Sequence, residues 1–256
     1  MIGENLVKRY GWIPDLPDKR DTYFLSKPVS VPDKIDLRPN CPPVFSQGDI
    51  GSCTGNAISN AHLFEQMRQS KQLITPSRLF IYYNEREMEG TVNEDSGAMI
   101  RDGIKSTVKL GVCDENNWAY NTDLFAEKPP SACYTQAEKY QTLKYQRLDN
   151  ENLNDLQNCL AQGFPFVFGF TVYESFESNE VSYTGIVPMP KRHERVLGGH
   201  AVFCVGYNNE NKRFIVMNSW STGWGDKGFF YLPYDFMTDG DLADDFWTIK
   251  LVETGE

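Results

Sequence analysis

The hydrophobic pattern changes partway along the chain, at about residue 160. Before that point, apolar side chains recur at three- and four-residue steps, which predicts helices over residues 53–71, 76–89 and 98–109. After it, short runs rich in aromatic and β-branched residues are separated by Gly, Asn and Pro, which predicts antiparallel strands over residues 166–172, 200–207, 214–218 and 229–232. A helical half followed by a β half is typical of an α+β protein of two packed lobes, with a cleft at their junction.

The first 33 residues differ from the rest of the chain. They contain four prolines and five charges of each sign, so the formal net charge of −10 lies entirely on the remainder. A segment this rich in proline and turns does not form an independent domain. We therefore expect residues 1–33 to be an arm and residues 34–256 to be one folded domain.

Composition excludes several classes of function. Acidic residues outnumber basic ones by 35 to 25, and the densest basic stretch, residues 191–195, carries its own glutamate, which argues against nucleic-acid binding. The most apolar run, residues 164–170, is too short to span a bilayer, and the start of the chain lacks a signal-peptide pattern, so we expect a soluble protein without a membrane partner. No two of the six cysteines have CxxC spacing and the three histidines are scattered, so we expect neither a metal site nor a cofactor.

Cys53 opens the first predicted helix. A thiol at a helix N-terminus faces unsatisfied N–H groups and the positive end of the helix dipole, which favour the thiolate. A buried cysteine is more often structural than reactive, so a nucleophilic role for Cys53 requires a base.

Of the three histidines, His200 fits the part of that base best. His62 lies nine residues along the same helix, on the face opposite Cys53, and His193 lies in a charged loop. His200 begins an apolar strand directly after two glycines, and a base on a rigid strand can face a thiol at a helix end on the other lobe. Judged alone, His200 could equally be a buried strand histidine.

Two further side chains complete the arrangement. Asn218, in the next strand, can accept a hydrogen bond from the far nitrogen of His200, and the tryptophans beside it can shield that bond from water. Gln47, six residues before Cys53, can return to the helix end and share an oxyanion hole with the Cys53 N–H. Taken alone, Asn218 would be a turn residue.

Three segments, in this order, resemble the papain/cathepsin family of cysteine peptidases. They are Gln47-Gly48-x-x-Gly51-Ser52-Cys53, then Gly198-Gly199-His200-Ala201, then Asn218-Ser219-Trp220 followed by Gly223-Trp224-Gly225-x-x-Gly228. The resemblance spans about residues 34–232 and implies the papain-like fold: a helical lobe over about residues 34–145, an antiparallel β lobe over about residues 146–256, and an active-site cleft between them.

The same resemblance implies a role for each of these residues. Cys53 is the nucleophile, His200 the general acid and base, Asn218 the residue that orients it, and Gln47 the oxyanion donor. Trp220 covers the bond between Asn218 and His200. The reaction implied is hydrolysis of peptide bonds through an acyl-enzyme.

The chain departs from the family signature at two positions near the nucleophile. The signature's first cysteine is Ile50 here, and the aromatic residue after the nucleophile is Thr54. In the family that first cysteine pairs with one near the substrate-binding glycines, but residues 93–97 contain no cysteine either, so one disulfide is missing as a unit. The other cysteines can be free or paired, and Cys204 is expected to be buried and unpaired; the five lie at positions 41, 113, 133, 159 and 204.

The resemblance also implies a set of substrate-binding residues: Gly51, Ser96, Gly97, Met99, Gly169, Gly199, Ala201 and Trp220. Ser96 and Gly97 would bind extended peptide backbone along one wall, and Met99 with Gly169 and Ala201 would line an apolar pocket, although Met99 could equally be core. Three acidic residues near the end are assigned to a solvated loop rather than to that pocket: Asp241, Asp244 and Asp245. No histidine lies between residues 68 and 192, so a His-bearing occluding loop is absent, which favours endopeptidase action.

The arm resembles the short arm of some bacterial relatives. We expect it to lie over the cleft or to place an aromatic side chain beside it, as an inhibitory pro-segment; the alternative is an arm packed on the back of the domain. Two rival functions remain: a peptide-binding homologue without activity, and a transpeptidase, ligase or amidase that uses the same acyl-enzyme. We expect a monomer whose partners are peptide or protein substrates and its own arm, secreted or in an acidic, lysosome-like compartment.

Overall fold

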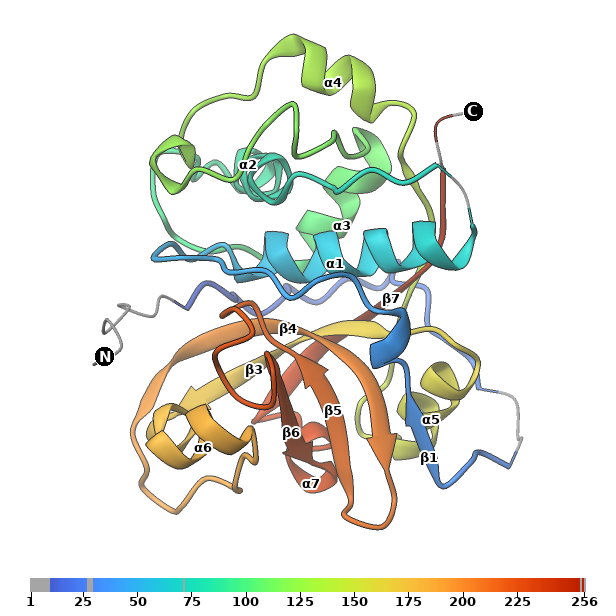
Figure 1. The fold of residues 1–256 in the computed structure, drawn as a ribbon, viewed down its shortest axis with the longest axis vertical. Coiled ribbons are helices and arrows are strands. Elements are labelled where there is room, and N and C mark those ends of the chain that lie inside the picture. Colours follow the sequence, from blue (N-terminus) through green and yellow to red (C-terminus); the bar gives the residue numbers. More distant parts are fainter. Residues whose placement is uncertain (1–9, 27–29, 71, 254, 256) are drawn as a thin grey trace.

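Two lobes of different secondary structure make up the molecule, as the computed structural model in Figure 1 shows. The structure describes residues 10–26, 30–70, 72–253 and 255, so residues 1–9 and 27–29 of the predicted arm lie outside the described residues. The upper lobe in Figure 1 is helical, the lower lobe is built on a β-sheet, and the arm (dark blue) runs between them. The predicted α+β class with two packed lobes is confirmed.

The helical lobe contains four α-helices in the part of the chain that the structure describes: α1 (Cys53–Arg68), α2 (Arg78–Glu89), α3 (Ile100–Lys109) and α4 (Ser131–Ala137). The first three were predicted. The second begins at Arg78 because the Ser77 hydroxyl accepts from Phe80 N–H at 3.2 Å and caps it. The third begins at Ile100 because the backbone of Ala98 is paired with the arm. Within the described residues, no helix is long and apolar enough to cross a membrane.

The β lobe is built on an antiparallel sheet whose described strands have the order β2-β7-β3-β4-β5-β6, with β1 paired to β4. The four predicted strands correspond to β3 (Phe166–Tyr173), β4 (Val196–Asn208), β5 (Arg213–Met217) and β6 (Phe229–Pro233). The sequence pattern did not predict the other three: β1 (Lys34–Asp36), β2 (Thr142–Arg147) and β7 (Ala243–Val252).

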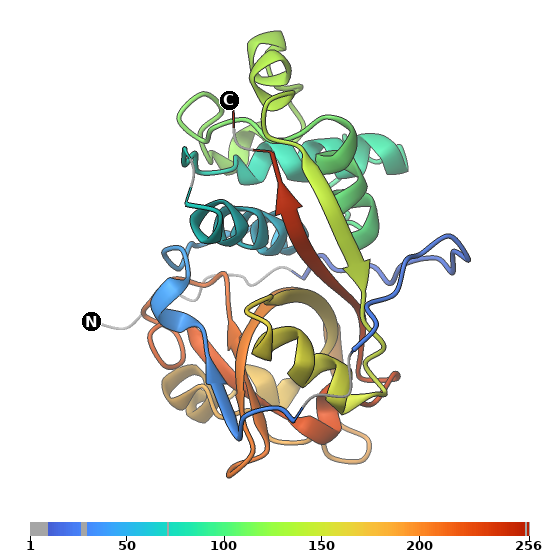
Figure 2. The ribbon, with the colours of Figure 1, turned by 90° about the vertical axis from the view of Figure 1, so that its right-hand side faces the viewer.

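Strands β2 and β7 run side by side from the β lobe into the helical lobe, as Figure 2 shows. At the far end of β7, the Gln69 side chain after α1 donates to the Val252 carbonyl at 2.8 Å. At the other end of the domain, β1 pairs with β4. The predicted lobe boundaries are therefore wrong at both ends, because residues 34–36 belong to the β-sheet and the end of β7 packs on the helical lobe. These pairings join residues far apart in sequence, so local patterns do not reveal them.

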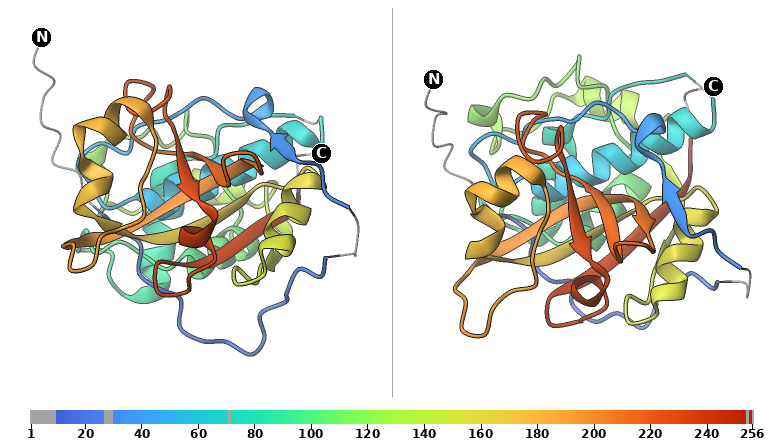
Figure 3. Two further views of the ribbon diagram at one scale, coloured as in Figure 1. Left: turned by 90° about the horizontal axis from the view of Figure 1, so that it is seen from below. Right: turned by 60° about the horizontal axis from the view of Figure 1, so that its bottom comes forward.

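Short helices cover the sheet on either side. Seen from below in Figure 3, α5 (Leu153–Ala161) and α6 (Asn179–Thr184) lie at opposite sides of the β lobe, and α7 (Tyr234–Met237) follows β6. Single 3-10 turns occupy Arg38–Asn40, Thr122–Leu124 and Glu174–Glu177. The core beneath them is largely aromatic, and rings such as Phe168 and Phe246 stack at 4.9 Å between centroids.

The arm adds a residue to this core. Phe24 is buried among the β-lobe side chains, with 3% of its surface exposed. Its N–H donates to the Arg147 carbonyl at 2.7 Å, and Arg147 N–H donates to the Thr22 carbonyl at 2.9 Å, so this part of the arm extends the edge of β2. Residues 22–24 are therefore part of the fold and not a loosely attached tail.

We expect Phe24→Ala to lower the free energy of unfolding by about 3–5 kcal/mol, the usual cost of removing a buried aromatic ring. The neighbouring Leu25 is 84% exposed, and Leu25→Ala should change it by less than about 0.5 kcal/mol. Urea titration of both full-length variants measures this. Equal, small effects would mean that the arm is not part of the cooperative fold.

Candidate active site

The turn that leads into α1 is held against the β lobe through Gln47. Its N–H donates to the Ser219 carbonyl at 2.8 Å, and its side-chain oxygen accepts from the Ser219 hydroxyl at 2.6 Å. Its amide nitrogen donates to the Ile50 carbonyl within the turn at 2.9 Å. The Gln47 side chain is buried. Its orientation is therefore fixed from both sides, close to the first residue of α1.

His200 in β4 and Asn218, directly after the end of β5, come together. The imidazole Nε2 lies 2.8 Å from Asn218 Oδ1, which also accepts from Ser219 N–H at 2.9 Å. Because a carbonyl oxygen only accepts, Nε2 carries the proton and Nδ1 is left as the nitrogen that can take up or give a proton. Trp220 stacks on the imidazole with centroids 5.0 Å apart and planes at 23°, and Phe170 packs against another side of the ring at 5.7 Å.

Cys53 lies against β4. The thiol accepts from Ala201 N–H at 3.4 Å, directly after His200 in the strand, so the two lobes bring the cysteine and the histidine to one place. The thiol is fully buried. Burial raises its pKa to about 12, although N–H groups of Ala201, Gly11 and Thr54 oppose the rise. The expectation that the helix terminus favours the thiolate is therefore wrong for this fully buried thiol, because desolvation outweighs the N–H groups.

The other two histidines lie elsewhere. His62 is buried in α1, with its ring nitrogens 3.2 Å from the Tyr140 carbonyl and 3.0 Å from the Gln66 amide, and burial lowers its pKa to about 4. His193 is exposed in the loop before β4. His62 is thus a buried histidine with both ring nitrogens in hydrogen bonds.

Residues 10–13 of the arm run through this site. Trp12 N–H donates to the Gly199 carbonyl at 2.9 Å, on the β side. On the helical side, Ala98 N–H donates to the Gly11 carbonyl at 2.7 Å and Ile13 N–H to the Ala98 carbonyl at 3.0 Å, which makes a parallel bridge. The arm backbone is therefore hydrogen-bonded to both lobes at once, next to Cys53.

Side chains of the arm fill the space on either side of that backbone. The Trp12 ring lies so close to Gly169 that a Cβ there would meet Trp12 Cε2 at 2.0 Å. Its indole N–H donates to Asp245 Oδ2 at 3.0 Å. The Tyr10 ring meets the His200 ring edge-on at 5.9 Å, and its hydroxyl bonds the Glu177 carboxylate. Glycines in the arm and along both walls permit this close approach. A Cβ on Gly11 of the arm, for example, would lie 1.7 Å from the Gly51 carbonyl oxygen.

Four carboxylates and two arginines anchor the next stretch of the arm. Asp15 accepts from Arg101 N–H at 3.0 Å and from the Trp247 indole at 2.9 Å, and its own N–H donates to Asp245 at 2.7 Å. Asp21 pairs with the Arg101 guanidinium at 3.1 Å. Arg147 lies 3.0 Å from Asp245, 2.8 Å from Asp244, 3.5 Å from Asp21 and 3.8 Å from Asp15.

The carboxylates outnumber the cations in this cluster, and the side chains of Asp15, Asp21 and Asp245 are buried, whereas that of Asp244 is partly exposed. Burial and the neighbouring Asp15 raise the pKa of Asp245 to about 7, although Arg147 opposes the rise. Burial likewise raises the pKa of Asp15. The assignment of Asp245 to a solvated loop is wrong: it belongs to β7, where a register shift and a φ of 58° turn its fully buried side chain toward the arm.

The residues expected to bind substrate fall into two groups. The first group lies next to the arm or the thiol. An added Cβ would meet the arm or its neighbours at Gly51, Gly97, Gly169 and Gly199, and Ala201 contacts Cys53. Ser96 donates to the Gly97 carbonyl at 3.1 Å, and Met99 precedes α3 with its N–H on the Glu89 carboxylate at 2.8 Å. Sequence reasoning missed Ala98, whose backbone pairs with the arm, and Asp245.

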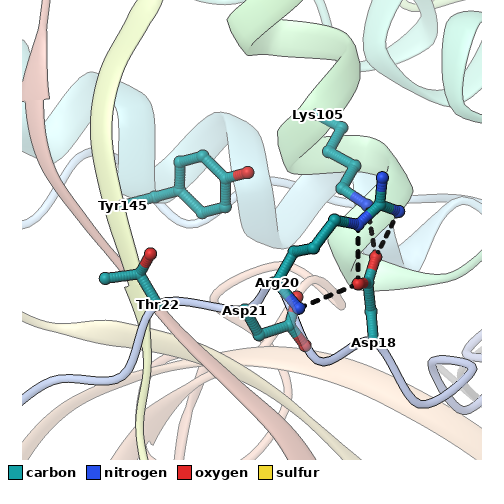
Figure 4. Close-up of a pocket in the computed structure, with 6 residues that line it drawn as sticks. All are labelled: Asp18, Arg20, Asp21, Thr22, Lys105 and Tyr145. Carbon is teal, nitrogen blue, oxygen red and sulfur yellow. Dashed lines mark hydrogen bonds and ion pairs between the residues drawn. The ribbon is translucent and has the colours of Figure 1, made fainter.

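A hollow of about 470 Å³ opens beside the arm, between α3 and β2 (Figure 4). Its lining is polar, from Asp18, Arg20, Asp21, Thr22, Lys105 and Tyr145. Asp18 pairs with Arg20 of the arm at 2.7 Å and with Lys105 of α3 at 3.5 Å. The lining residues of the hollow include neither Cys53 nor His200.

Comparison with known proteins gives one consistent result. Residues 31–244 match the family model described as papain family cysteine protease. An uncharacterised peptidase C1-like protein of Acanthamoeba polyphaga mimivirus is 43% identical over 98% of this chain and 90% of its own length. The crystal structure of xylellain, a cysteine protease from Xylella fastidiosa, has a TM-score of 0.88 and 42% identity, with 96% of each chain covered. Peptidase 1 of Dermatophagoides pteronyssinus is 26% identical over 79% of this chain and 61% of its own.

The family match covers most of the chain, and the fold agrees with that of a cysteine protease along almost its whole length. The chain belongs to the papain family of cysteine proteases.

Proposed function

We propose that the protein is an endopeptidase in which Cys53, His200, Asn218 and Gln47 carry the reaction, and that arm residues 10–13 hold it inactive. The observation that carries the proposal is that the Cys53 thiol accepts a hydrogen bond from the N–H of Ala201, directly after His200. The imidazole of His200 is fixed on its other side by Asn218. A nucleophile, a base and a residue that orients the base are the parts that acyl transfer requires.

The chemistry follows from these positions. His200 Nδ1 takes the proton of the Cys53 thiol, and the thiolate attacks the carbonyl carbon of the peptide bond. The oxyanion that forms accepts hydrogen bonds from Cys53 N–H and the Gln47 side-chain amide. His200 then gives its proton to the leaving amine, and a water molecule activated by the same ring hydrolyses the thioester. Asn218 keeps the ring in one tautomer throughout, under Trp220.

Two observations support the arm as an inhibitor. Residues 10–13 occupy the backbone partners on both lobes, at Ala98 and Gly199, that an extended substrate would use. The arm also buries Cys53, and burial raises the pKa of the thiol to about 12, so at neutral pH it stays protonated and a poor nucleophile.

The arm divides into a blocking part and an anchored part. Residues 15–24 are held by buried carboxylates and by Phe24 in the core, whereas residues 10–13 are held by backbone pairing and the Trp12 ring. We infer that the cleft opens when residues 10–13 leave it while the anchored part stays.

In the full-length chain carrying Trp12→Ala, which releases the arm, Cys53→Ala should lower the rate of peptide hydrolysis by a factor of about 10⁴ or more, because the acyl-enzyme can no longer form. Cys41→Ser, a change outside the site, should leave the rate within about twofold. A fluorogenic peptide assay with product analysis measures both. A new amide formed with an added amine would assign the transpeptidase alternative instead.

Trp12→Ala in the full-length chain should raise the rate of peptide hydrolysis by about 30-fold, since truncating a partly buried tryptophan anchor costs about 2 kcal/mol of binding energy. The matched control is Leu16→Ala on the same arm, where the side chain is 66% exposed, and it should have no effect. An unchanged rate in the Trp12 variant would place the inhibitory role elsewhere or nowhere.

Raising the pH should open the cleft. With the arm in place, burial raises the pKa of Asp245 to about 7 and also raises that of Asp15. When residues 10–13 leave the cleft, Trp12 no longer covers Asp245, so the pKa of Asp245 falls toward its ordinary value near about 4. The closed state therefore binds more protons between about pH 4 and pH 7 and is favoured at the acid end. The activity of the wild-type chain divided by that of Trp12→Ala, which cancels the titration of the catalytic groups, should therefore rise across this range.

Asp15→Asn removes the neighbouring charge that helps to raise the pKa of Asp245 and should flatten that ratio. Asp33→Asn, an exposed change of the same charge on the same segment, should leave its slope intact. A ratio that falls as the pH rises would contradict the assigned role of the carboxylate pair.

A further inference from the structure

The Asp95 carboxylate connects the two segments that border the cysteine on the helical side. Gly51 N–H, two residues before Cys53, donates to Asp95 Oδ1 at 2.8 Å and Oδ2 at 3.1 Å. The Tyr82 hydroxyl donates to Asp95 Oδ1 at 2.6 Å and itself accepts from Gly97 N–H at 3.2 Å. One carboxylate and one hydroxyl thus join the turn that leads into α1 to the segment 95–98.

Both of these segments carry groups of the proposed site. The first carries the N–H of Cys53 and the Gln47 side chain. The second presents the backbone of Ala98, which pairs with the arm at 2.7 and 3.0 Å. The spacing between them sets where a bound backbone lies relative to the thiol, so a change of about 1 Å is enough to slow catalysis about 100-fold.

The connection rests on a rigid base. Arg86 of α2 is fully buried and places its guanidinium 3.9 Å from the centre of the Tyr82 ring. The same guanidinium donates to the carbonyls of Val92 and Glu94 at 2.9 Å each, immediately before Asp95. The carboxylate is therefore presented from a loop that is itself fixed to a helix, as a positioning element must be.

A covalent link is missing at this place. The papain-like signature predicts a disulfide from position 50 to the segment near the substrate-binding glycines, and this chain has Ile50 and no cysteine in residues 93–97. The hydrogen bonds of Asp95 span the same two segments. Bonds from N–H and O–H donors to an ionised carboxylate are about twice as strong as neutral ones, which suits them to this task.

We propose that Asp95 is a positioning residue for catalysis, which fixes the segment 95–98 against the nucleophile turn through Gly51 and Tyr82 and does the work of the missing disulfide. This rests on the proposed peptidase function. It implies that Asp95 matters for ligands that span both segments and not for reagents that need only the thiol.

The test compares two alkylating reagents on the full-length chain carrying Trp12→Ala. Iodoacetamide reads the reactivity of Cys53 alone, and a dipeptidyl chloromethyl ketone also needs the backbone partners on segment 95–98. Asp95→Ala should slow the peptidyl reagent by about 10- to 100-fold and iodoacetamide by less than about twofold. Asp95→Asn, which keeps one acceptor oxygen, should lie between, and Tyr82→Phe, which keeps the ring on Arg86, should shift the ratio in the same direction.

Asp49→Asn is the matched control, because it removes an equal charge from an exposed residue of the same turn. It should leave both rates unchanged. Equal slowing of both reagents in the Asp95 variants, or no slowing of either, would overturn the positioning role.

Hydrogen exchange provides a readout that does not depend on peptidase activity. In the same chains, Asp95→Ala should speed exchange of the Gly51 and Gly97 amides at least about tenfold relative to Asp49→Asn, since both amides lose the network that holds them. Unchanged exchange would overturn the proposal. If Cys53 of the parent chain resists both reagents while exchange responds as expected, the peptidase proposal fails and the role of Asp95 as a tether stands.

Discussion

The contact between the N-terminal end of α1 and strand β4 is the interaction on which the rest of the site depends. Helix α1 is buried from Cys53 to Gln66 at the boundary of the lobes, and its first residue places a sulfur atom on the N–H of Ala201. A helix end and a strand are both rigid, so their contact fixes the relative position of a thiol and an imidazole without any loop in between. Strands β2 and β7 then hold the two lobes together by backbone pairing, so that this contact persists although the residues that make it are 148 positions apart.

In the proposed function, the contact between α1 and β4 also explains how a short arm can block the site. A short piece of backbone can cover the thiol where both walls offer N–H and carbonyl groups and no Cβ occupies the space. Ala98 and Gly199 supply the groups, and Gly169 leaves room for the Trp12 ring. In the proposed function, residues 10–13 cover the cysteine, whereas the anchoring is provided further along by buried charges and by Phe24. The proposed blocking part and the anchored part are separate in the sequence.

Sequence reasoning succeeded where the signal was local. The start of α1 at Cys53 and the strand around His200 follow from hydrophobic period and flanking glycines, and the structure has both. It failed for β7, where Asp245 looked like part of a polar loop. That side chain is buried only because a bulge in β7 turns it inward and because Trp12 and Asp15, more than 200 residues away, cover it. The sequence left the path of the arm open because residues 11–13 pair with backbone groups of Ala98 and Gly199, which leave no trace in residue type.

Asp95 connects the two segments that border the cysteine on the helical side. A disulfide holds two segments at a fixed spacing whatever the pH, but it needs an oxidising environment to form. A carboxylate that accepts from Gly51 N–H and the Tyr82 hydroxyl needs no oxidant, and Arg86 beneath the Tyr82 ring keeps positive charge close to it. In the structure none of the six cysteines, all of which lie in its described part, forms a disulfide. A chain that fixes its cleft with hydrogen bonds alone can assemble a cysteine protease site whether or not its surroundings oxidise thiols.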